Sequence, residues 1–344
     1  MKKPILILKI GTASITRPDG RPDEPVMVDI ARQVAQLHRH HHIVMVSSGA
    51  VGMGKRWLTQ FSGQMTERKA AAAIGNPILM NKYSQFFAPY DIALAQSLCE
   101  RRHFSDRSQF LQLRDTFETL WDNNIIPIAN ENDVVSNLEL KFSDNDELAT
   151  LIAVGFGADL LLLATSVEGV LDAQDQLVPL INTFDAQTMG LARKGTSSAG
   201  LGGMISKLTF ARLATKMGIK VVIFGARTPD GILKAVNGQT GTICPSQPSS
   251  LSARNKWLAS GGLVSGRLLI DEGAFAALTK RKSLLAVGVL EILEPFGEGE
   301  VFELVKEDLV PIAVARAKIS SDALHRQFQA RGLEIAHADD IVLL

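Results

Sequence analysis

The chain has 344 residues, enough for about two domains of ordinary size. Hydrophobic residues make up 46% and charged residues 21%, which excludes a disordered or fibrous protein. Thirty-six Lys and Arg balance thirty-six Asp and Glu, so no overall basic charge exists to attract nucleic acid or an anionic membrane. Cys99 and Cys244 are too few for a disulfide framework, which favours a cytoplasmic protein. Lys9 interrupts the first apolar run and Gly155 interrupts the run Leu151–Ala164, so we expect no signal peptide and no membrane span.

Short apolar runs alternate with helical patterns through the first part of the chain, and each run is typical of a strand buried on both faces. The runs are Ile5–Ile10, Ile43–Val46, Ile92–Gln96, Ile125–Ala129, Leu160–Ala164 and Val221–Phe224. Helical spacing relates Ile30, Val34 and Leu37, and again Phe110, Leu113, Phe117 and Leu120. This alternation predicts an α/β domain with a mainly parallel sheet sandwiched by helices. In such sheets a ligand binds beyond the carboxyl ends of the strands.

The composition changes near the Pro/Ser-rich stretch that follows Cys244, which is typical of a linker. We therefore predict a first domain over residues 1–245, a linker over 246–256 and a small, mostly β domain over 257–344. Strand-like runs in this second domain are Leu263–Ile270, Val287–Leu293 and Glu300–Val305, with one short helical pattern at Gly273–Thr279.

The first two strands end in residues suited to anion binding. The first ends at Lys9-Ile10-Gly11-Thr12, where an ammonium group and backbone N–H groups can meet phosphate oxygens, although a lysine at a sheet rim can equally be solvated. After the second, Gly49 to Lys55 has the spacing of a phosphate loop, but Arg56 stands where that motif needs Ser or Thr. We favour a glycine-rich turn into a helix, with Ser48 able to donate to a carboxylate or another anion.

Acidic and amide side chains gather after the next strand. The segment Asn130–Asp133 follows that strand, and Ser143-Asp144-Asn145-Asp146 begins another helix. Asp144 and Asn145 can simply cap this helix, whereas Asp133 precedes β-branched residues and has no such role. Carboxylates close to a phosphate site suit a substrate ammonium group or a magnesium ion.

Two further segments have the features of a nucleotide site. Thr165-Ser166 follows a strand, and Gly200–Lys207 leads into a helix, where free N–H groups, the helix dipole and a lysine would form a phosphate cradle. The alternative is a flexible loop followed by an ordinary helix lysine. The run His38–His42 is interpreted as a solvated helix end, because adjacent side chains point in different directions, and we predict no metal ligand in the chain.

Taken together, these segments resemble the amino acid kinase family, and within it the branch that phosphorylates glutamate. The segments that carry the resemblance are Lys9–Thr12, Ser47–Ala50, Lys69–Gly75, Asn130–Asp133, Ser143–Asp146 and Gly202–Lys207. After the linker, Asp271–Ala274 and Lys282–Leu285 are similar to the PUA module that many of these enzymes carry.

The resemblance implies a reaction and a set of site residues. The reaction is ATP-dependent phosphorylation of the γ-carboxylate of L-glutamate to L-glutamyl 5-phosphate, the first step of proline biosynthesis. Ser48, Asp133 and Asn145 would bind glutamate, and Lys9 and Lys207 would be catalytic. The residues implied in ATP binding are Lys9, Thr165, Ser166, Leu201, Gly202, Gly203, Met204, Ile205, Ser206 and Lys207. Mg²⁺ would accompany ATP, and the resemblance further implies a homo-oligomer with proline as a feedback inhibitor.

The chain departs from the family pattern on the nucleotide side. Family members usually have Thr-Asp where this chain has Thr165-Ser166, a Tyr in place of Leu171, and a Thr in place of Leu201. The glutamate side keeps the pattern. We therefore expect the acceptor to be a family substrate and the nucleotide contacts to differ in detail.

Two other interpretations remain open. A kinase of the same fold could use acetylglutamate, aspartate, uridylate or carbamate, although Asp133 favours a free amine over an acylated one. An RNA-associated protein is the second interpretation, because PUA modules elsewhere bind RNA. From Arg254 onward the chain has eleven Lys and Arg against thirteen Asp and Glu, and this slightly acidic balance is a poor match to RNA.

Overall fold

The computed structural model describes residues 3–17, 19–135, 144–185, 188–191, 201–248, 264–307, 309, 311–328, 330 and 332–343. The chain divides into two compact units, one formed by Met1–Glu100 with Leu111–Ser249 and the other by Arg101–Phe110 with Ser250–Leu344. Most of the predicted linker lies outside the described residues, so the bounds 246–256 stay a prediction.

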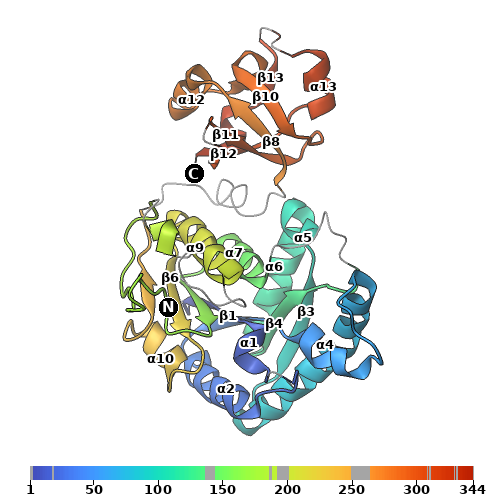
Figure 1. The fold of residues 1–344 in the computed structure, drawn as a ribbon, viewed down its shortest axis with the longest axis vertical. Coiled ribbons are helices and arrows are strands. Elements are labelled where there is room, and N and C mark those ends of the chain that lie inside the picture. Colours follow the sequence, from blue (N-terminus) through green and yellow to red (C-terminus); the bar gives the residue numbers. More distant parts are fainter. Residues whose placement is uncertain are drawn as a thin grey trace. The chain divides into compact units, whose positions relative to one another are not determined.

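A seven-stranded sheet forms the centre of the first unit (Figure 1). Its strands are β1 (Ile5–Ile10), β2 (His42–Ser47), β3 (Leu94–Cys99), β4 (Ile126–Glu131), β5 (Leu160–Thr165), β6 (Lys220–Gly225) and β7 (Thr242–Cys244). They lie in the order β3-β4-β2-β1-β5-β6-β7, and all pairs are parallel except β6 with β7. The carboxyl ends of β4, β2, β1 and β5 therefore meet at one edge of the sheet, where the chain order reverses on either side of β1.

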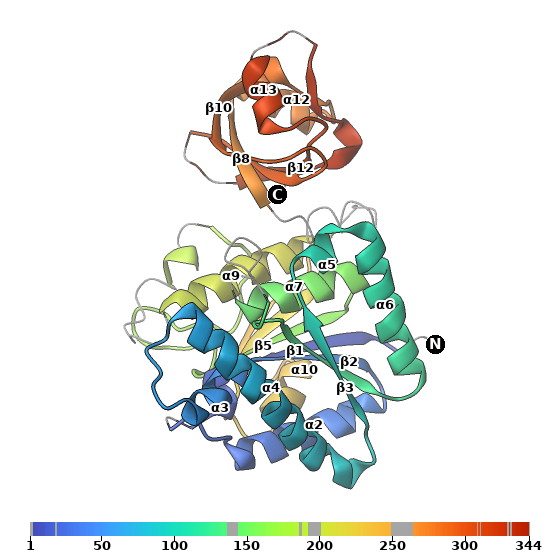
Figure 2. The same cartoon turned by 90° about the vertical axis from the view of Figure 1, so that its right-hand side faces the viewer.

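Helices cover both faces of this sheet, as the two cartoon views agree (Figures 1 and 2). The α-helices of this unit are α1 (Thr12–Ile15), α2 (Glu24–His38), α3 (Ala50–Gly54), α4 (Met65–Phe87), α6 (Arg107–Asp122), α7 (Asn145–Phe156), α9 (Leu201–Lys216) and α10 (Gly231–Val236). The helix α5 (Arg102–Ser105) and the start of α6 belong to the segment Arg101–Phe110, which is grouped with the second unit. Short 3₁₀ turns follow α3 at Lys55–Trp57 and α4 at Ala88–Tyr90. α6, α7 and α9 lie on one face, and α2, α4 and α10 on the other.

Successive side chains of β1 point alternately toward the helices on one face of the sheet and toward those on the other. Leu6, Leu8 and Ile10 belong to the hydrophobic core shared with α2, α4 and α10. Because successive side chains point to opposite faces, Ile7 and Lys9 point toward the layer of α7 and α9. A lysine thus ends a fully buried strand on the side where α7 packs against β1.

The second unit has its own sheet and its own hydrophobic core. Its strands are β8 (Val264–Ile270), β9 (Leu284–Leu285), β10 (Val289–Glu294), β11 (Val301–Val305), β12 (Pro311–Arg316), β13 (Glu334–Ala336) and β14 (Ile341–Leu343). The order β10-β8-β11-β12-β14 is antiparallel except where β8 pairs with β11, and β9 pairs separately with β13. The helices are α12 (Glu272–Thr279) and α13 (Ser321–Arg326), with 3₁₀ turns at Ala286–Gly288 and Ala338–Asp340.

The predicted fold is confirmed in both units, and all six predicted strands of the first domain are present within three residues of their predicted bounds at each end. The last strand of the first sheet was missed, because it has only three residues, Thr242–Cys244, directly before the predicted linker. In the described part of the chain, no helix combines the length and the apolar character that crossing a membrane requires.

Candidate active site

Two lysines share one buried carboxylate at the edge of the first sheet. Lys9 Nζ lies 2.7 Å from Asp146 Oδ1, and Lys207 Nζ lies 2.8 Å from Asp146 Oδ2. The side chains are only 7%, 8% and 1% exposed for Lys9, Lys207 and Asp146. They come from β1, α9 and α7, so three segments far apart in sequence meet here. Because two ammonium groups share one carboxylate, this buried cluster carries a net positive charge.

The pKa shifts follow from this arrangement. Burial lowers the pKa of Lys9, and the neighbouring Lys207 lowers it further, while Asp146 opposes both effects. Burial by itself would raise the pKa of Asp146, but the two ammonium groups hold that pKa below its usual range. Asp146 is therefore ionised at neutral pH, and it keeps two buried cations close together.

The first turn of α7 places Asp146 by an ordinary helix cap. Asp144 precedes the helix in an extended conformation, and its carboxylate accepts from the backbone N–H groups of Asp146 and Glu147. Gly157 ends the helix with a left-handed backbone, which favours glycine. The capping role that the sequence left open for Asp144 is thus present.

A chain of amide hydrogen bonds connects the neighbouring strand ends. Asn145 Nδ2 donates to Ser48 Oγ at 2.7 Å and to Asn130 Oδ1 at 3.0 Å. Asn130 Nδ2 in turn donates to Asn76 Oδ1 at 3.1 Å, which links the strand ends to α4. Asn145 Oδ1 is buried and has no hydrogen-bond partner among the described residues. A buried acceptor without a partner is uncommon, and it fits a donor supplied by a ligand.

These residues form the wall of a pocket of about 220 Å³. It is lined by Thr12, Ser48, Gly49, Ala50, Val51, Arg68, Asn130, Glu131, Asp133, Asp144 and Asn145. The three residues predicted to bind the acceptor, Ser48, Asp133 and Asn145, therefore line one pocket. Asn145 is directly followed by Asp146, so the pocket adjoins the two lysines. A pocket of this size suits a small polar molecule.

The predicted nucleotide residues lie on the other side of the lysines. Lys9 pairs with Leu163 of β5, so Thr165 and Ser166 follow at the same edge of the sheet, half-buried and exposed respectively. α9 begins at Leu201, earlier than the sequence suggested, so Gly202 and Gly203 form its first turn rather than a preceding loop. Nothing described lies within 4 Å of a Cβ built on Gly203.

Other residues of this helix add to the same side. The Ser206 hydroxyl is buried without a hydrogen-bond partner among the described residues, and Ile205 is exposed. Met204 is half-buried. The first turn of a helix has free N–H groups, so an open first turn beside Lys207 is suited to a phosphate group.

Three other sequence features have different structures. Residues Gly49–Lys55, which have the spacing of a phosphate loop, form α3 and the start of a 3₁₀ turn, with Gly49 in a left-handed conformation before the helix. His38 ends α2 while His42 begins β2, so the histidine run is split between two elements. Within the residues that the structure describes, no group of three or more His, Cys, Asp or Glu side chains could hold a metal ion.

Sequence reasoning missed Asp146, Asn130 and Arg68 as site residues. Asp146 was noticed only as part of a motif, although two buried lysines require a carboxylate partner, and this requirement could have identified it. Asn130 and Arg68 line the pocket through tertiary contacts that no spacing in the sequence reveals.

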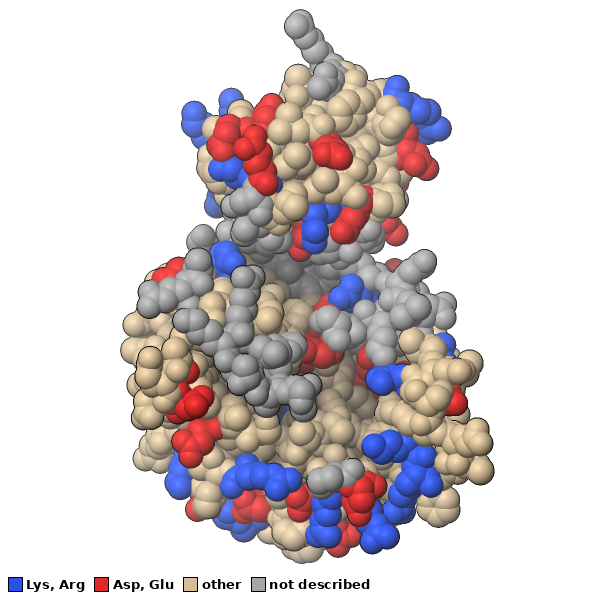
Figure 3. Space-filling model, viewed as in Figure 1, with Lys and Arg blue, Asp and Glu red and all other residues tan. Residues whose placement is uncertain are grey.

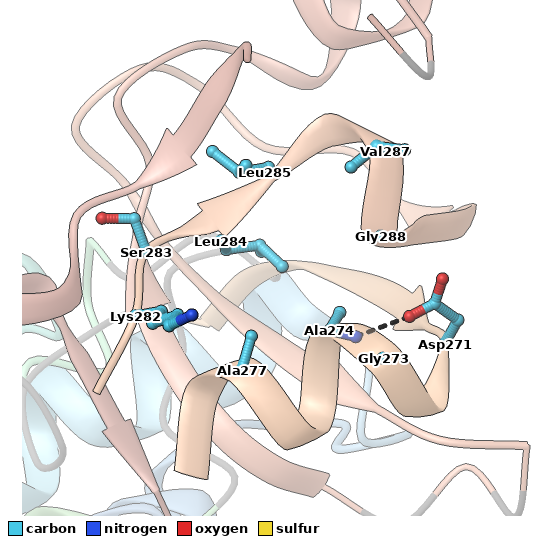
Figure 4. A pocket seen from close by; sticks show the side chains of 10 residues that line it. All are labelled: Asp271, Gly273, Ala274, Ala277, Lys282, Ser283, Leu284, Leu285, Val287 and Gly288. Atoms are coloured by element: carbon cyan, nitrogen blue, oxygen red, sulfur yellow. Dashed lines mark hydrogen bonds between the residues drawn. The ribbon is translucent and has the colours of Figure 1, made fainter. Parts of the chain in front are cut away.

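A second pocket, of about 400 Å³, lies in the second unit between α12 and the segment 282–288 (Figure 4). It is lined by Asp271, Gly273, Ala274, Ala277, Lys282, Ser283, Leu284, Leu285, Val287 and Gly288. Asp271 caps α12 by accepting from the N–H group of Ala274 at 2.6 Å. The two runs that resemble a PUA module, Asp271–Ala274 and Lys282–Leu285, thus face each other across this pocket.

Comparisons with known proteins agree with the fold. The sequence profile of the amino acid kinase family matches residues 4–225, and that of the PUA domain matches residues 266–337. Solved structures with a similar fold include UMP kinase from Ureaplasma parvum, at 14% identity over 71% of this chain and 97% of that one, with a TM-score of 0.51. Carbamate kinase from Giardia lamblia bound to AMP-PNP matches at 18% identity over 71% and 99%, also with a TM-score of 0.51. The chain belongs to the amino acid kinase family.

Within this family, curated relatives that match nearly the whole chain are glutamate 5-kinases. The enzyme of Proteus mirabilis is 36% identical over 93% of this chain and 90% of its own length. That of Haemophilus influenzae is 32% identical over the full length of both. That of Kosmotoga olearia is 36% identical over 88% of this chain and 85% of its own length. The resemblance predicted from the sequence is confirmed across both domains.

Proposed function

We propose that this protein transfers the γ-phosphoryl group of ATP to the γ-carboxylate of L-glutamate, which gives L-glutamyl 5-phosphate and ADP at the first step of proline biosynthesis. The observation that carries the chemistry is the pair of buried lysines on Asp146, next to a pocket lined by the predicted acceptor residues. Relatives that match nearly the whole chain support the choice of glutamate.

The geometry suits phosphoryl transfer, because the protein mainly positions the reactants and stabilises charge in such reactions. Lys9 and Lys207 supply two cations, and Asp146 neutralises only one. In the proposed reaction a γ-carboxylate oxygen forms a bond to the γ-phosphorus, and the bond from that phosphorus to the β,γ-bridging oxygen breaks. The electron pair leaves with ADP. The carboxylate is ionised well above its pKa of about 4.3, so the step needs no general base.

The proposed acceptor contacts use the pocket wall. Asp133 and the unpartnered Asn145 Oδ1 would accept from the ammonium group of glutamate, and the Ser48 hydroxyl would contact a substrate carboxylate. On the nucleotide side, Thr165, Ser166 and residues 201–207 would contact ATP. Ser206 supports this proposal because its buried hydroxyl has no described partner.

Mg²⁺ belongs to this proposal as the ion that accompanies ATP. Magnesium is usually held by one or two carboxylates together with the phosphates of the substrate, and it keeps several waters. Asp144 lines the pocket and offers an oxygen ligand of the kind that Mg²⁺ prefers. A homo-oligomer and feedback inhibition by proline complete the proposal on the ground of the family resemblance. A cytoplasmic location is supported by the presence of only two cysteines.

A panel of acceptors tests the proposed reaction. We expect the purified protein with ATP and Mg²⁺ to release ADP with L-glutamate, and to form an acyl phosphate that hydroxylamine traps. L-Aspartate, N-acetyl-L-glutamate, UMP and carbamate should give less than about a hundredth of the kcat/KM, since they lack the matching groups. Turnover of one of these acceptors without turnover of L-glutamate would contradict the proposal.

Lys207→Ala tests the catalytic role separately. If Lys207 stabilises the charge of the transferring group, kcat should fall about 100-fold or more while the KM for glutamate changes little. Lys216→Ala, at the far end of the same helix, is the matched control and should keep kcat within about twofold. Equal kcat in both variants would show that Lys207 is not catalytic.

A further inference from the structure

An amino acid substrate in the 220 Å³ pocket needs a cation for its α-carboxylate, and the charged residues that line the pocket show which one is available. Its lining includes the carboxylates Glu131, Asp133 and Asp144, and among the described lining residues Arg68 is the one Lys or Arg. L-Glutamate carries two carboxylates and one ammonium group. The γ-carboxylate must approach the phosphoryl group beside Lys9 and Lys207, so the α-carboxylate needs another cation.

Arg68 has no partner among the residues that the structure describes. The structure gives its guanidinium group no ion pair and no side-chain hydrogen bond to any described residue. Its neighbour Glu67 is already engaged, because Glu67 Oε2 accepts from the N–H groups of Ser62, Gly63 and Gln64. This capping box fixes the start of α4, and Arg68 lies in its first turn on a different side from Glu67.

Helix packing holds Arg68 at the pocket. Arg68, Ala71 and Gly75 are spaced by three and seven residues and share one face of α4. On that face α4 touches α3 backbone to backbone: a Cβ on Gly75 would lie 1.7 Å from the carbonyl oxygen of Ala50, and one on Gly54 would lie 1.9 Å from that of Ala71. Gly75 lies against Ala50 and Ala71 lies against Gly54, so Arg68, one turn before Ala71, lies past Gly54 on the same face. Arg68 lines the pocket together with Ala50 and Val51.

We propose that Arg68 binds the α-carboxylate of the acceptor and thereby makes the enzyme select substrates with a free α-carboxylate. The inference rests on the proposed function and adds a specificity-determining residue to it. A guanidinium group presents two parallel N–H donors that match the two oxygens of a carboxylate. α4 contributes no residue to the cluster of Lys9, Asp146 and Lys207, so this contact anchors the end of the substrate that does not react.

The test compares L-glutamate with its α-amide, L-isoglutamine, in which the α-carboxylate alone is replaced. Arg68→Gln should raise the KM for L-glutamate about 30-fold and keep kcat and the KM for ATP within about threefold. L-Isoglutamine is measured as a competitive inhibitor against L-glutamate, so that its Ki is obtained whether or not it is phosphorylated. That Ki should be the same in Arg68→Gln and in the unmodified protein within about twofold.

Two further variants make the comparison specific. Arg68→Lys keeps the charge without the planar fork, and it should give a KM between those of Arg68→Gln and the unmodified protein. Arg56→Gln removes an exposed guanidinium group that lies over the Trp57 ring, 5.3 Å from its centroid, and it should leave both constants unchanged.

Three results would overturn the assignment of Arg68. They are an unchanged KM for L-glutamate in Arg68→Gln, an equal loss of affinity for L-glutamate and L-isoglutamine, and an effect of Arg56→Gln as large as that of Arg68→Gln. Failure of the unmodified protein to phosphorylate L-glutamate at all would instead contradict the proposed function, so the two failures are distinguishable.

Discussion

Asp146 determines the charge of the site although its side chain is almost completely buried. Its carboxylate is bound by Lys9 on one oxygen and by Lys207 on the other. Without it, two buried ammonium groups would face each other with no anion between them, which is a costly arrangement. We therefore interpret Asp146 as a positioning residue that favours the protonated form of Lys9 and holds both lysines at the same point.

The pH dependence of an Asp146→Asn variant checks this interpretation. Burial and Lys207 lower the pKa of Lys9 below its ordinary 10.5, and only Asp146 raises it strongly. Activity that requires protonated Lys9 should therefore fall on the alkaline side, and in Asp146→Asn this fall should occur at lower pH. We expect kcat at neutral pH to decrease at least 10-fold, with a smaller change in the KM for glutamate. The measurement is the pH profile of kcat.

Thermal stability supplies a control for the same variant. The pKa of Asp146 is lowered in the folded protein, so its ion pairs stabilise the fold above the ordinary carboxyl range and are lost as the pH falls through the folded value. The Tm of Asp146→Asn should thus depend less on pH than that of the unmodified protein when the pH falls below the ordinary carboxyl pKa of 3.8. If the alkaline fall in kcat occurred at the same pH in Asp146→Asn as in the unmodified protein, the proposed role of Asp146 would be contradicted.

Several residues of the site could be predicted because a parallel sheet gathers the residues that follow its strands. Lys9, Ser48 and Asp133 each follow or end a buried strand, and the structure brings them to one edge. Arg68 and Asn130 could not be assigned in this way. Arg68 depends on how α4 crosses α3, and the amide contacts of Asn130 depend on side-chain orientation that only the folded structure fixes.

At the scale of elements, continuous apolar runs were sufficient to find the buried strands, since a strand buried on both faces needs no polar residues. The helix α4 was not predicted, because Gly75 and Pro77 inside it are residues that normally disfavour a helix. The structure gives a reason for Gly75: α3 and α4 approach so closely that no side chain fits there. A tertiary contact therefore overrides the local preference.

Gly75→Ala tests this contact. Alanine favours a helix over glycine by about 1 kcal/mol, but its Cβ would lie 1.7 Å from the Ala50 carbonyl oxygen, so the helices must separate. We expect the clash to dominate and to lower the free energy of unfolding by about 2–3 kcal/mol. Because Ser48 and Arg68 flank this crossing, the KM for glutamate should rise as well. Denaturant unfolding and kinetics measure the two effects.

The exposed face of the same helix offers the matched control. Ala73→Ser changes a residue that points to solvent, so both stability and KM should stay close to those of the unmodified protein. If Gly75→Ala were as stable as Ala73→Ser, the close packing of α3 against α4 would not require a glycine at residue 75.

At the scale of the whole molecule, the chain contains two units with separate hydrophobic cores. On the face drawn in Figure 3, Lys and Arg alternate with Asp and Glu over the described surface of each unit, so neither unit has a field of one sign there. This agrees with the balanced composition. The core of the second unit includes Phe296 and Phe302, whose rings stack with their centroids 4.4 Å apart.

If each core stabilises its own unit, Phe302→Ala should change the stability of only the second one. Replacing a fully buried phenylalanine costs about 3–5 kcal/mol, which for a domain of this size lowers the Tm by about 10 °C or more. Calorimetry should show one transition moved and the other unchanged, while glutamate kinetics below that transition stay the same. Leu162→Ala, in the buried strand β5, should instead move the other transition. A single transition that moves in both variants would show that the two units unfold together, and the second unit would then contribute to the stability of the catalytic one.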